Sequence, residues 1–218
     1  METRYWKFNK NLGKFTTKVD ESTAGAVKYE HPMIPGGFKW QLEVPTLAGH
    51  IESLYIDDSQ YGQQLCIGLQ NSAGVDVLQV PTRKQNSEWP VAEYAYLAKR
   101  IGNFDVDRVL ELKAAKFPGK DKDGKPTGYD VFRVFPHQGS RNAVAEYLTR
   151  DKQPKIESGT VGSKQVWDTD PLFKALEEQV EAFNIANKGK LDEMRGNREP
   201  TKNEVAAQSN DILEDCPF

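Results

Sequence analysis

The chain has 218 residues, a net charge of −3, and a composition that is 38% hydrophobic and 28% charged. That length fits one domain with extensions or two small domains, and the high polar content predicts one compact core with disordered flanks. No apolar run approaches the roughly 18 residues that span a bilayer, and residues 1–20 contain no apolar segment typical of a secretory signal. We therefore expect a cytoplasmic protein that does not enter a membrane.

Charge is distributed unevenly along the chain. Residues 1–150 hold 20 Lys and Arg against 18 Asp and Glu, whereas residues 151–218 hold 9 against 14. A mildly basic body with an acidic end is compatible with a nucleic-acid partner, although the body is less basic than most DNA-binding domains. The two cysteines, Cys66 and Cys216, are too few for a disulfide framework or a structural zinc site, and we predict no cofactor and no metal.

Residues 1–24 form the first segment, which is polar and basic with interspersed aromatic residues. We interpret this segment as a flexible, basic aromatic arm. Alternating aromatic residues also suit an edge strand, so packing of Trp6 and Phe8 on the body is the alternative.

The segment 25–150 has the patterns of a β-rich domain. Apolar and polar residues alternate with the period of a strand, and polar turns separate the strands. The predicted strands are 38–44, 49–58, 64–70, 75–80, 108–115 and 129–135, with a hairpin loop at 120–125. Between the fourth and fifth of these, apolar residues from Val91 to Ile101 follow helical spacing, with Ser87 as the expected N-cap.

This order of several strands, one helix and two more strands predicts a mainly β protein with an OB-fold. The OB-fold is a five-stranded Greek-key barrel, here with one helix between strands 3 and 4. A general α+β sandwich shares the same order of elements and is the alternative fold.

Residues 151–195 are predicted to form a linker and a C-terminal helix. The part from Asp151 to Val166 is polar and rich in small residues, which is typical of a loop. A helix follows, capped by Asp168 or Asp170, with Pro171 in its first turn. We expect its apolar stripe to dock on the barrel, with self-association into a homo-oligomer as the alternative. The stripe consists of Leu172, Leu176, Val180 and Phe183.

Residues 196–218 are predicted to form a disordered acidic tail with an apolar tip. Almost no apolar residue occurs from Gly196 to Asn210, so this part cannot bury enough surface to fold. The tip is Asp211, Ile212, Leu213, Glu214, Asp215, Cys216, Pro217 and Phe218. Acids beside an aromatic residue and its free carboxylate fit a basic-rimmed apolar pocket on a partner protein.

This tip resembles that of bacterial single-stranded-DNA-binding proteins, which is acidic and ends in Ile-Pro-Phe, and the acidic, aromatic-ended tails of the phage proteins. Cys216 replaces an apolar β-branched residue, and the match rests on Asp211, Glu214, Asp215, Pro217 and Phe218. The body is larger than the compact bacterial type, so the resemblance leans to the phage type and to the host cell cytoplasm. It implies a non-enzymatic protein that binds single-stranded DNA during replication, recombination or repair. It also implies that residues 211–218 recruit partner enzymes.

Binding a strand without sequence preference requires basic groups for the phosphates and flat aromatic faces for the bases. Alternation along 108–117 and 129–135 places such groups opposite the Leu110 and Leu112 face. The predicted DNA-binding residues are Tyr55, Arg83, Lys84, Lys113, Lys116, Phe117, Tyr129 and Arg133. We interpret Trp40 and Phe135 as core residues, because Trp40 shares its face with three apolar residues, Phe38, Leu42 and Val44.

Two alternative functions stay open. Glu111-Leu112-Lys113 resembles the carboxylate-x-lysine element of metal-dependent nucleases, in which the carboxylate holds Mg²⁺ and the lysine positions the attacking water. That chemistry requires a second carboxylate nearby, for which Asp76 is the nearest candidate. The other alternative is an OB-type protein–protein adaptor that does not bind DNA.

Overall fold

The computed structural model describes residues 2–30, 35–59, 62–84, 87–120, 123, 125–161 and 164–196. The predicted tail, including all the residues from Asp211 to Phe218, lies outside these ranges. Within them the protein is mainly β, as predicted. In chain order the elements are β1 (Glu2–Asn9), β2 (Lys14–Val19), β3 (Val27–Glu30), β4 (Phe38–Val44), β5 (Thr46–Ser59), β6 (Gly62–Asn71), β7 (Gly74–Pro81), α1 (Ala92–Ala98), a 3₁₀ turn (Ile101–Asn103), β8 (Leu110–Lys120), β9 (Pro126–His137), β10 (Glu157–Val161), β11 (Lys164–Asp168) and α2 (Asp170–Arg195).

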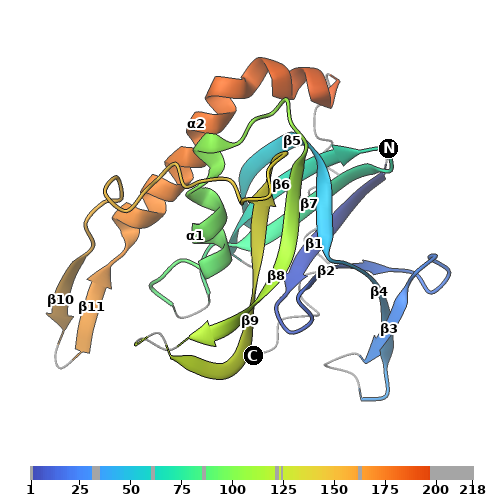
Figure 1. Cartoon of the computed structure of the whole chain (residues 1–218), viewed down its shortest axis with the longest axis horizontal. Coiled ribbons are helices and arrows are strands. Elements are labelled where there is room, and N and C mark those ends of the chain that lie inside the picture. The colour runs from blue at the N-terminus through green and yellow to red at the C-terminus, as the bar shows by residue number, and fades with distance from the viewer. Residues whose placement is uncertain are drawn as a thin grey trace.

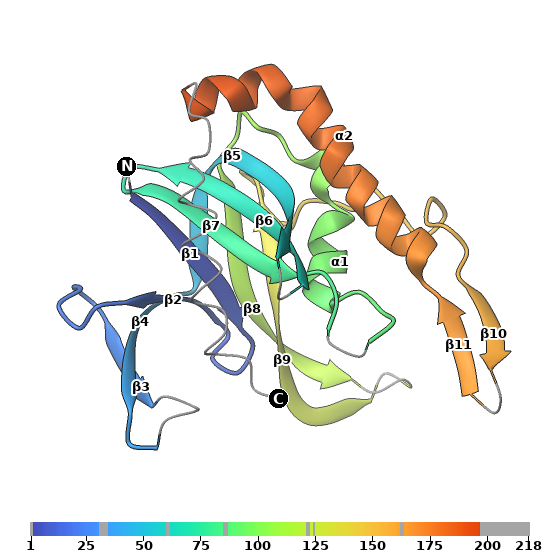
Figure 2. The same cartoon turned by 180° about the vertical axis from the view of Figure 1, so that it is seen from behind.

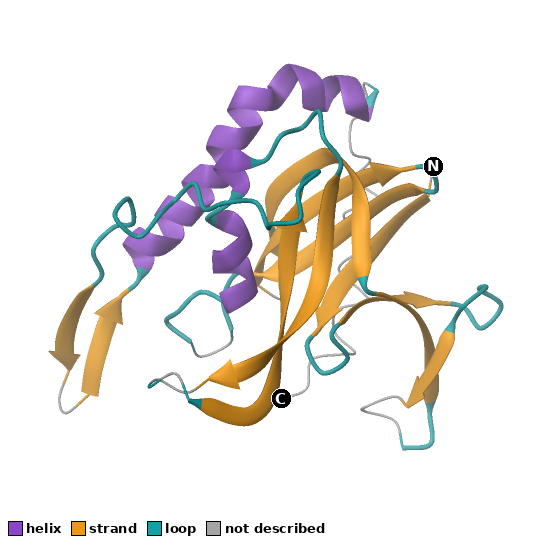
Figure 3. Cartoon of the chain, in the orientation of Figure 1, coloured by secondary structure: helices purple, strands orange, loops and turns teal. Residues whose placement is uncertain are grey.

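One mixed sheet holds β1 to β9 in the order β3-β4-β2-β1-β7-β6-β5-β8-β9. β5, β6 and β7 pair as consecutive antiparallel strands, and after α1 the chain returns so that β8 lies on the other side of β5. The spatial order β8-β5-β6-β7 is that of a Greek key. β9 completes an antiparallel hairpin with β8. Figure 1 shows α1 between the curved sheet and α2, and Figure 3 separates the helices from the strands by colour.

The first strand belongs to the sheet, which corrects the prediction of a flexible arm. β1 runs parallel to β7 and antiparallel to β2. Trp6 is only 2% exposed, and its indole nitrogen donates a 2.7 Å hydrogen bond to Asp76. The same carboxylate accepts hydrogen bonds from Arg4 at 2.9 Å and from Asn71 at 2.6 Å. Because buried carboxylates require such partners, Asp76 ties β1 firmly to β7. The predicted boundary between arm and domain at residue 24 therefore falls between β2 and β3, two strands of the same sheet.

The turn between β1 and β2 contacts the far edge of the sheet. Gly13 in this turn has a φ of +62°, and a Cβ at this position would lie 2.1 Å from the ring of Phe132 in β9. Glycine satisfies both the backbone conformation and the close approach. Among the described strands, β7 and β9 do not pair with each other. The β1–β2 hairpin connects the two, because β1 pairs with β7 and the turn after β1 contacts β9.

The hydrophobic core lies between the sheet and the two helices. The stripe predicted on α2 is buried in this core, and α2 packs mainly against β5. The docking interpretation is therefore confirmed, and this stripe is not available for self-association. Representative core residues are Leu54, Ile67, Leu78, Leu97, Leu112, Leu172, Leu176, Val180 and Phe183. No helix in the described part of the chain is long and apolar enough to cross a membrane.

Both helices are capped differently from the prediction. The N-cap of α1 is Val91, and the Ser87 hydroxyl accepts a hydrogen bond from the backbone nitrogen of Trp89. The N-cap of α2 is Thr169, whose hydroxyl donates to the backbone oxygen of Glu88 and not to its own helix. The predicted cap residues instead make local bonds, Ser87 with Trp89 and the Asp168 carboxylate with the backbone nitrogen of Asp170.

The polar segment predicted as a loop contains the hairpin β10–β11, which projects from the start of α2 (Figure 2). Its strands include Thr160, Val166 and Trp167, which favour extended structure. The low apolar content hid this hairpin, because a two-stranded sheet exposed on both faces has no clear hydrophobic period.

Strand β4 also differs from the prediction, which treated one of its faces as core. Phe38 is 56% exposed and Trp40 is partly exposed, whereas Leu42 and Val44 pack against the core. β3 and the start of β4 extend away from the body (Figure 2). Alternation shows which residues share a face of a strand, but not how far the rest of the protein covers that face.

Candidate functional site

The β8–β9 hairpin divides its side chains between two faces, as the alternation predicts. Leu110, Leu112 and Val134 lie on the buried face. The register pairs Lys113 with Phe135, Ala115 with Arg133, and Phe117 with Val131 on the opposite side. We call this second set the hairpin face, and it consists of Lys113, Ala115, Phe117, Val131, Arg133 and Phe135.

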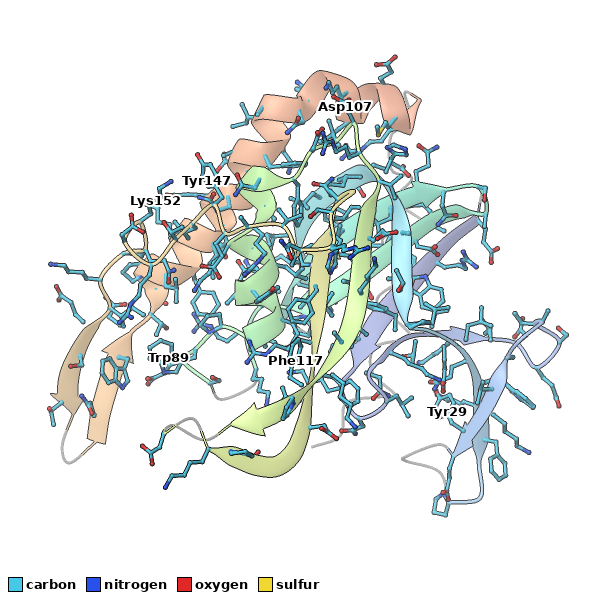
Figure 4. All side chains as sticks on the ribbon, in the orientation of Figure 1. Tyr29, Trp89, Asp107, Phe117, Tyr147 and Lys152 are labelled. Atoms are coloured by element: carbon cyan, nitrogen blue, oxygen red, sulfur yellow. The ribbon has the colours of Figure 1, made fainter. Side chains whose placement is uncertain are left out.

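Aromatic rings form a continuous group on the hairpin face. The ring centres of Phe117 and Phe135 lie 5.0 Å apart, and Phe135 meets Tyr96 of α1 edge-on at 5.2 Å. Phe117 is 40% exposed, and Figure 4 marks it on the hairpin. Phe135 is partly buried between the two other rings, so its interpretation as a core residue is wrong. The group offers flat apolar surface to a ligand from solvent.

Basic side chains surround these rings. Arg133 is exposed and forms no ion pair with any described acid. Lys113 pairs with Glu111 at 2.6 Å, and both side chains are about two-fifths exposed. An ion pair in such contact with water contributes at most about 1 kcal/mol, so an anionic ligand competes for Lys113 readily. The hairpin face therefore combines aromatic surface with accessible positive charge.

Tyr96 joins the hairpin face to α1 and was not among the predicted site residues. Burial raises the pKa of its hydroxyl, while the positive charges of Arg100 and Arg133 lower that pKa and Glu146 raises it. The guanidinium carbon of Arg100 lies 3.5 Å from the centre of the Tyr96 ring. The sequence held a signal for this residue, since Tyr96 is an aromatic residue outside the buried positions of its helix.

Two predicted residues of the hairpin lie elsewhere or are not described. Lys116 is on the side of the hairpin opposite the face defined above, and its ammonium group pairs with Asp130 at 2.6 Å. Tyr129 belongs to β9, but its side chain is outside the described residues. Of the five hairpin residues predicted, Lys113, Phe117 and Arg133 are brought together.

Tyr55 lies apart from the hairpin face. It is nine residues along β5 from Thr46, the residue that pairs with Lys113. Burial and then the neighbouring Cys66 thiol raise the pKa of Tyr55. Its surroundings are partly buried and include the Asp57 carboxylate, unlike those of Arg133.

Arg83 and Lys84 belong to the loop between β7 and α1. Arg83 pairs with Asp170 at 3.3 Å, and its guanidinium carbon lies 4.1 Å from the centre of the Phe173 ring. These contacts fix the loop to the first turn of α2. Lys84 is exposed. The structure therefore gives Arg83 an anchoring role.

The same loop carries a second exposed aromatic group, which the sequence did not single out. Trp89 and Trp167, here called the tryptophan pair, are 42% and 37% exposed, with ring centres 6.0 Å apart. Acidic groups surround them. The carboxylate of Glu88 accepts a 3.4 Å hydrogen bond from the backbone nitrogen of Trp167, and Asp168 and Asp170 are exposed next to it in the chain. The pair attaches the β10–β11 hairpin to the loop before α1.

The residues suggested for a nuclease do not assemble into a metal site. Glu111 lies on β8 and is paired with Lys113, whereas Asp76 lies on β7, which two strands, β6 and β5, separate from β8 in the sheet. Asp76 is buried and fully engaged with β1 and the β6–β7 turn. The described residues contain no group of three or more His, Cys, Asp or Glu that could hold a metal ion.

No model of a protein family, no curated protein and no solved structure matches the chain.

Proposed function

We propose that the protein binds single-stranded DNA without sequence preference, through the hairpin face. The observation that carries this proposal is the combination of partly exposed aromatic rings, Phe117 and Phe135, with the guanidinium of Arg133, which pairs with no acid in the described part of the chain. Stacking of a base on an aromatic side chain contributes about 1–3 kcal/mol, and every base offers a flat face for it. A nearby cation contacts the phosphate that follows the stacked base.

We also infer that strands β5 to β9 with α1 form an OB-fold. Its support is the Greek-key order β8-β5-β6-β7 and the position of α1 between the third and fourth of these five strands. The OB barrel is partly open in many proteins. In this chain β1 takes the edge of β7, which closes part of that opening.

The tail of the chain supports a role in replication, recombination or repair. Its tip, residues 211–218, resembles those by which single-stranded-DNA-binding proteins recruit partner enzymes. In the absence of DNA, the tail's acids bind basic groups of the body. They therefore compete with a strand that binds there. That competition is electrostatic, so it weakens as salt is added.

A fluorescence-polarisation titration tests the DNA-binding proposal. We expect a labelled dT oligonucleotide to bind tightly and a duplex of the same length much more weakly. The affinity should fall with salt, with a log–log slope of about −0.7 for each phosphate contact. Equal affinity for both DNAs, or no binding to either, would contradict the proposal. Absence of binding would favour the adaptor alternative.

Removal of residues 209–218 tests the role of the tail. We expect the truncated protein to bind dT at least as tightly as the full chain, because the competing acids are absent. Recruitment of partner enzymes to DNA coated with the protein should be lost. Weaker DNA binding after truncation would show that the assignment of the tail is wrong.

A further inference from the structure

A second aromatic and basic element lies on the segment that connects β9 to β10, here called the strap (residues 138–156). Tyr147 in the strap is 45% exposed, and the ammonium nitrogen of Lys152 lies 5.0 Å from the centre of its ring. Figure 4 labels both residues, next to each other on the strap. Neither belongs to the predicted site or to the hairpin face.

The Tyr147 ring is held in place although it contributes little to the core. It lies directly over Gly102, where a Cβ would be 2.4 Å from the ring. The backbone nitrogens of Tyr147 and Leu148 donate to the carbonyl oxygen of Lys99 at 2.8 and 3.0 Å. The ring is therefore positioned before any ligand binds, which reduces the entropy that a stacking partner has to overcome.

The strap and the hairpin face are joined by direct contacts across α1. Phe135 of the hairpin face meets Tyr96, and Arg100 covers the Tyr96 ring. Arg100 also pairs with Glu146 at 3.1 Å and donates a 3.0 Å hydrogen bond to the Val144 carbonyl in the strap. One series of contacts thus runs from Phe117 through Phe135, Tyr96 and Arg100 to the strap that carries Tyr147.

The charge of the strap fits the phosphates of a strand. Its exposed basic residues are Arg141, Arg150, Lys152 and Lys155. Of the two acids among residues 138–156, Glu146 pairs with Arg100, and the exposed carboxylate of Asp151, which accepts a hydrogen bond from Thr149, is outnumbered by the four exposed bases. Accessible charge on this segment is therefore positive, in contrast to the surroundings of the tryptophan pair.

We propose that single-stranded DNA continues from the hairpin face across α1 to the strap, where one base stacks on Tyr147 and Lys152 contacts the adjacent phosphate. This inference rests on the proposed function, and it adds a second contact region at a defined place. The ammonium group that now lies near the Tyr147 ring is on an exposed, flexible side chain, so it moves to the phosphate when a base takes the ring.

The test is a titration of Tyr147→Ala with dT oligonucleotides of about 6 and about 20 nucleotides, one near the lower end of the usual range for one OB-fold and one beyond its upper end. We expect the long strand to bind about fivefold to a hundredfold more weakly than it binds the wild type, and the short strand to change much less. Tyr147→Phe keeps the flat ring and should restore wild-type affinity. Trp89→Ala is the matched control, because Trp89 is exposed to a similar degree among acids, and it should bind both strands as the wild type does.

Photo-crosslinking provides a measurement that does not depend on the folding of a variant. With the wild-type protein and a long oligonucleotide that carries 5-iododeoxyuridine, we expect crosslinked peptides from both residues 110–120 and residues 141–155. A long strand that crosslinks to the hairpin alone, or a Tyr147→Ala variant that binds it normally, would overturn the inference while leaving the proposed function intact. Failure of the wild type to bind any dT strand would instead refute the proposed function itself.

Discussion

The hairpin face and the tryptophan pair are two exposed aromatic groups with similar geometry and opposite charge. Phe117 and Trp89 are exposed to nearly the same degree, and each lies within 6.0 Å of a neighbouring ring. Arg133, Lys113 and Arg100, the last paired with Glu146, lie around the first group, whereas Glu88, Asp168 and Asp170, the last paired with Arg83, lie around the second. Exposed rings alone therefore do not define a site for a polyanion, and the sign of the neighbouring charge separates a binding surface from a packing contact.

The largest expected difference comes from removing one ring of each group. Phe117→Ala should weaken binding to a dT oligonucleotide by about fivefold to a hundredfold, because it removes a stacking surface. Trp89→Ala should leave the affinity within about twofold of the wild type, as expected of a surface residue that makes no DNA contact. Polarisation titrations at a fixed low salt concentration measure both. Equal losses in the two variants would abolish the distinction between the groups.

The next effect concerns charge on the hairpin face. Arg133→Gln should lower the log–log salt slope of dT binding by about 0.7, since one phosphate contact is lost. Arg83→Gln is the control from the loop beside the tryptophan pair, where the guanidinium is already engaged with Asp170 and Phe173. We expect its slope to equal that of the wild type when titrations are repeated over a range of salt. An unchanged slope in Arg133→Gln would place the phosphates elsewhere.

A smaller effect is expected from removing acids beside the tryptophan pair. In the double variant Glu88→Gln and Asp168→Asn, the new amide oxygens retain the acceptors for the backbone nitrogens of Trp167 and Asp170. Less repulsion of phosphates should strengthen dT binding by about twofold, the scale of single exposed charges. Weaker binding in this variant would mean that the acids assist the strand and that the comparison above is wrong.

Alkaline pH gives the smallest effect on binding and a clear one on stability. Burial raises the pKa of Tyr96, so its hydroxyl stays protonated and dT affinity should not change between about pH 7 and pH 9.5. Burial also raises the pKa of the Cys66 thiol to about 12, and the pKa values of Tyr55 and Tyr94 are raised too. Since the folded state holds these protons more tightly than the unfolded state, stability present below about pH 9 is lost as pH rises further. Urea denaturation at several pH values measures the loss, and constant stability up to pH 11 would contradict the burial of these groups.

The sequence predicted the part of the fold that depends on local patterns. The strands from 38 to 80, the helix after Val91, the β8–β9 hairpin and the helix after Pro171 all follow from the period of apolar residues. β1 was predicted as a strand only in the alternative, because its stabilising contacts, between Trp6, Arg4 and Asp76, join residues far apart in the chain. No local pattern encodes such a partner.

The candidate site was predictable to a similar extent. Alternation placed Lys113, Phe117 and Arg133 on one face, and the register confirms this. Alternation does not show which aromatic rings at the edge of the sheet stay accessible to solvent, so Phe135 was assigned to the core. Tyr96 reaches the site from α1, and only the packing of that helix against β9 brings the two together.

The parallel pairing of β1 with β7 also sets an order of events during synthesis. Arg4 and Asp76 are 72 positions apart, so roughly 4–14 s of synthesis pass between the addition of β1 and that of its partner strand β7. In that interval β1 has only its hairpin with β2, and the indole of Trp6 has no acceptor. β1 is thus made well before the strand that completes its pairing, and a chaperone that shields aromatic segments would meet it while its β7 edge is unpaired.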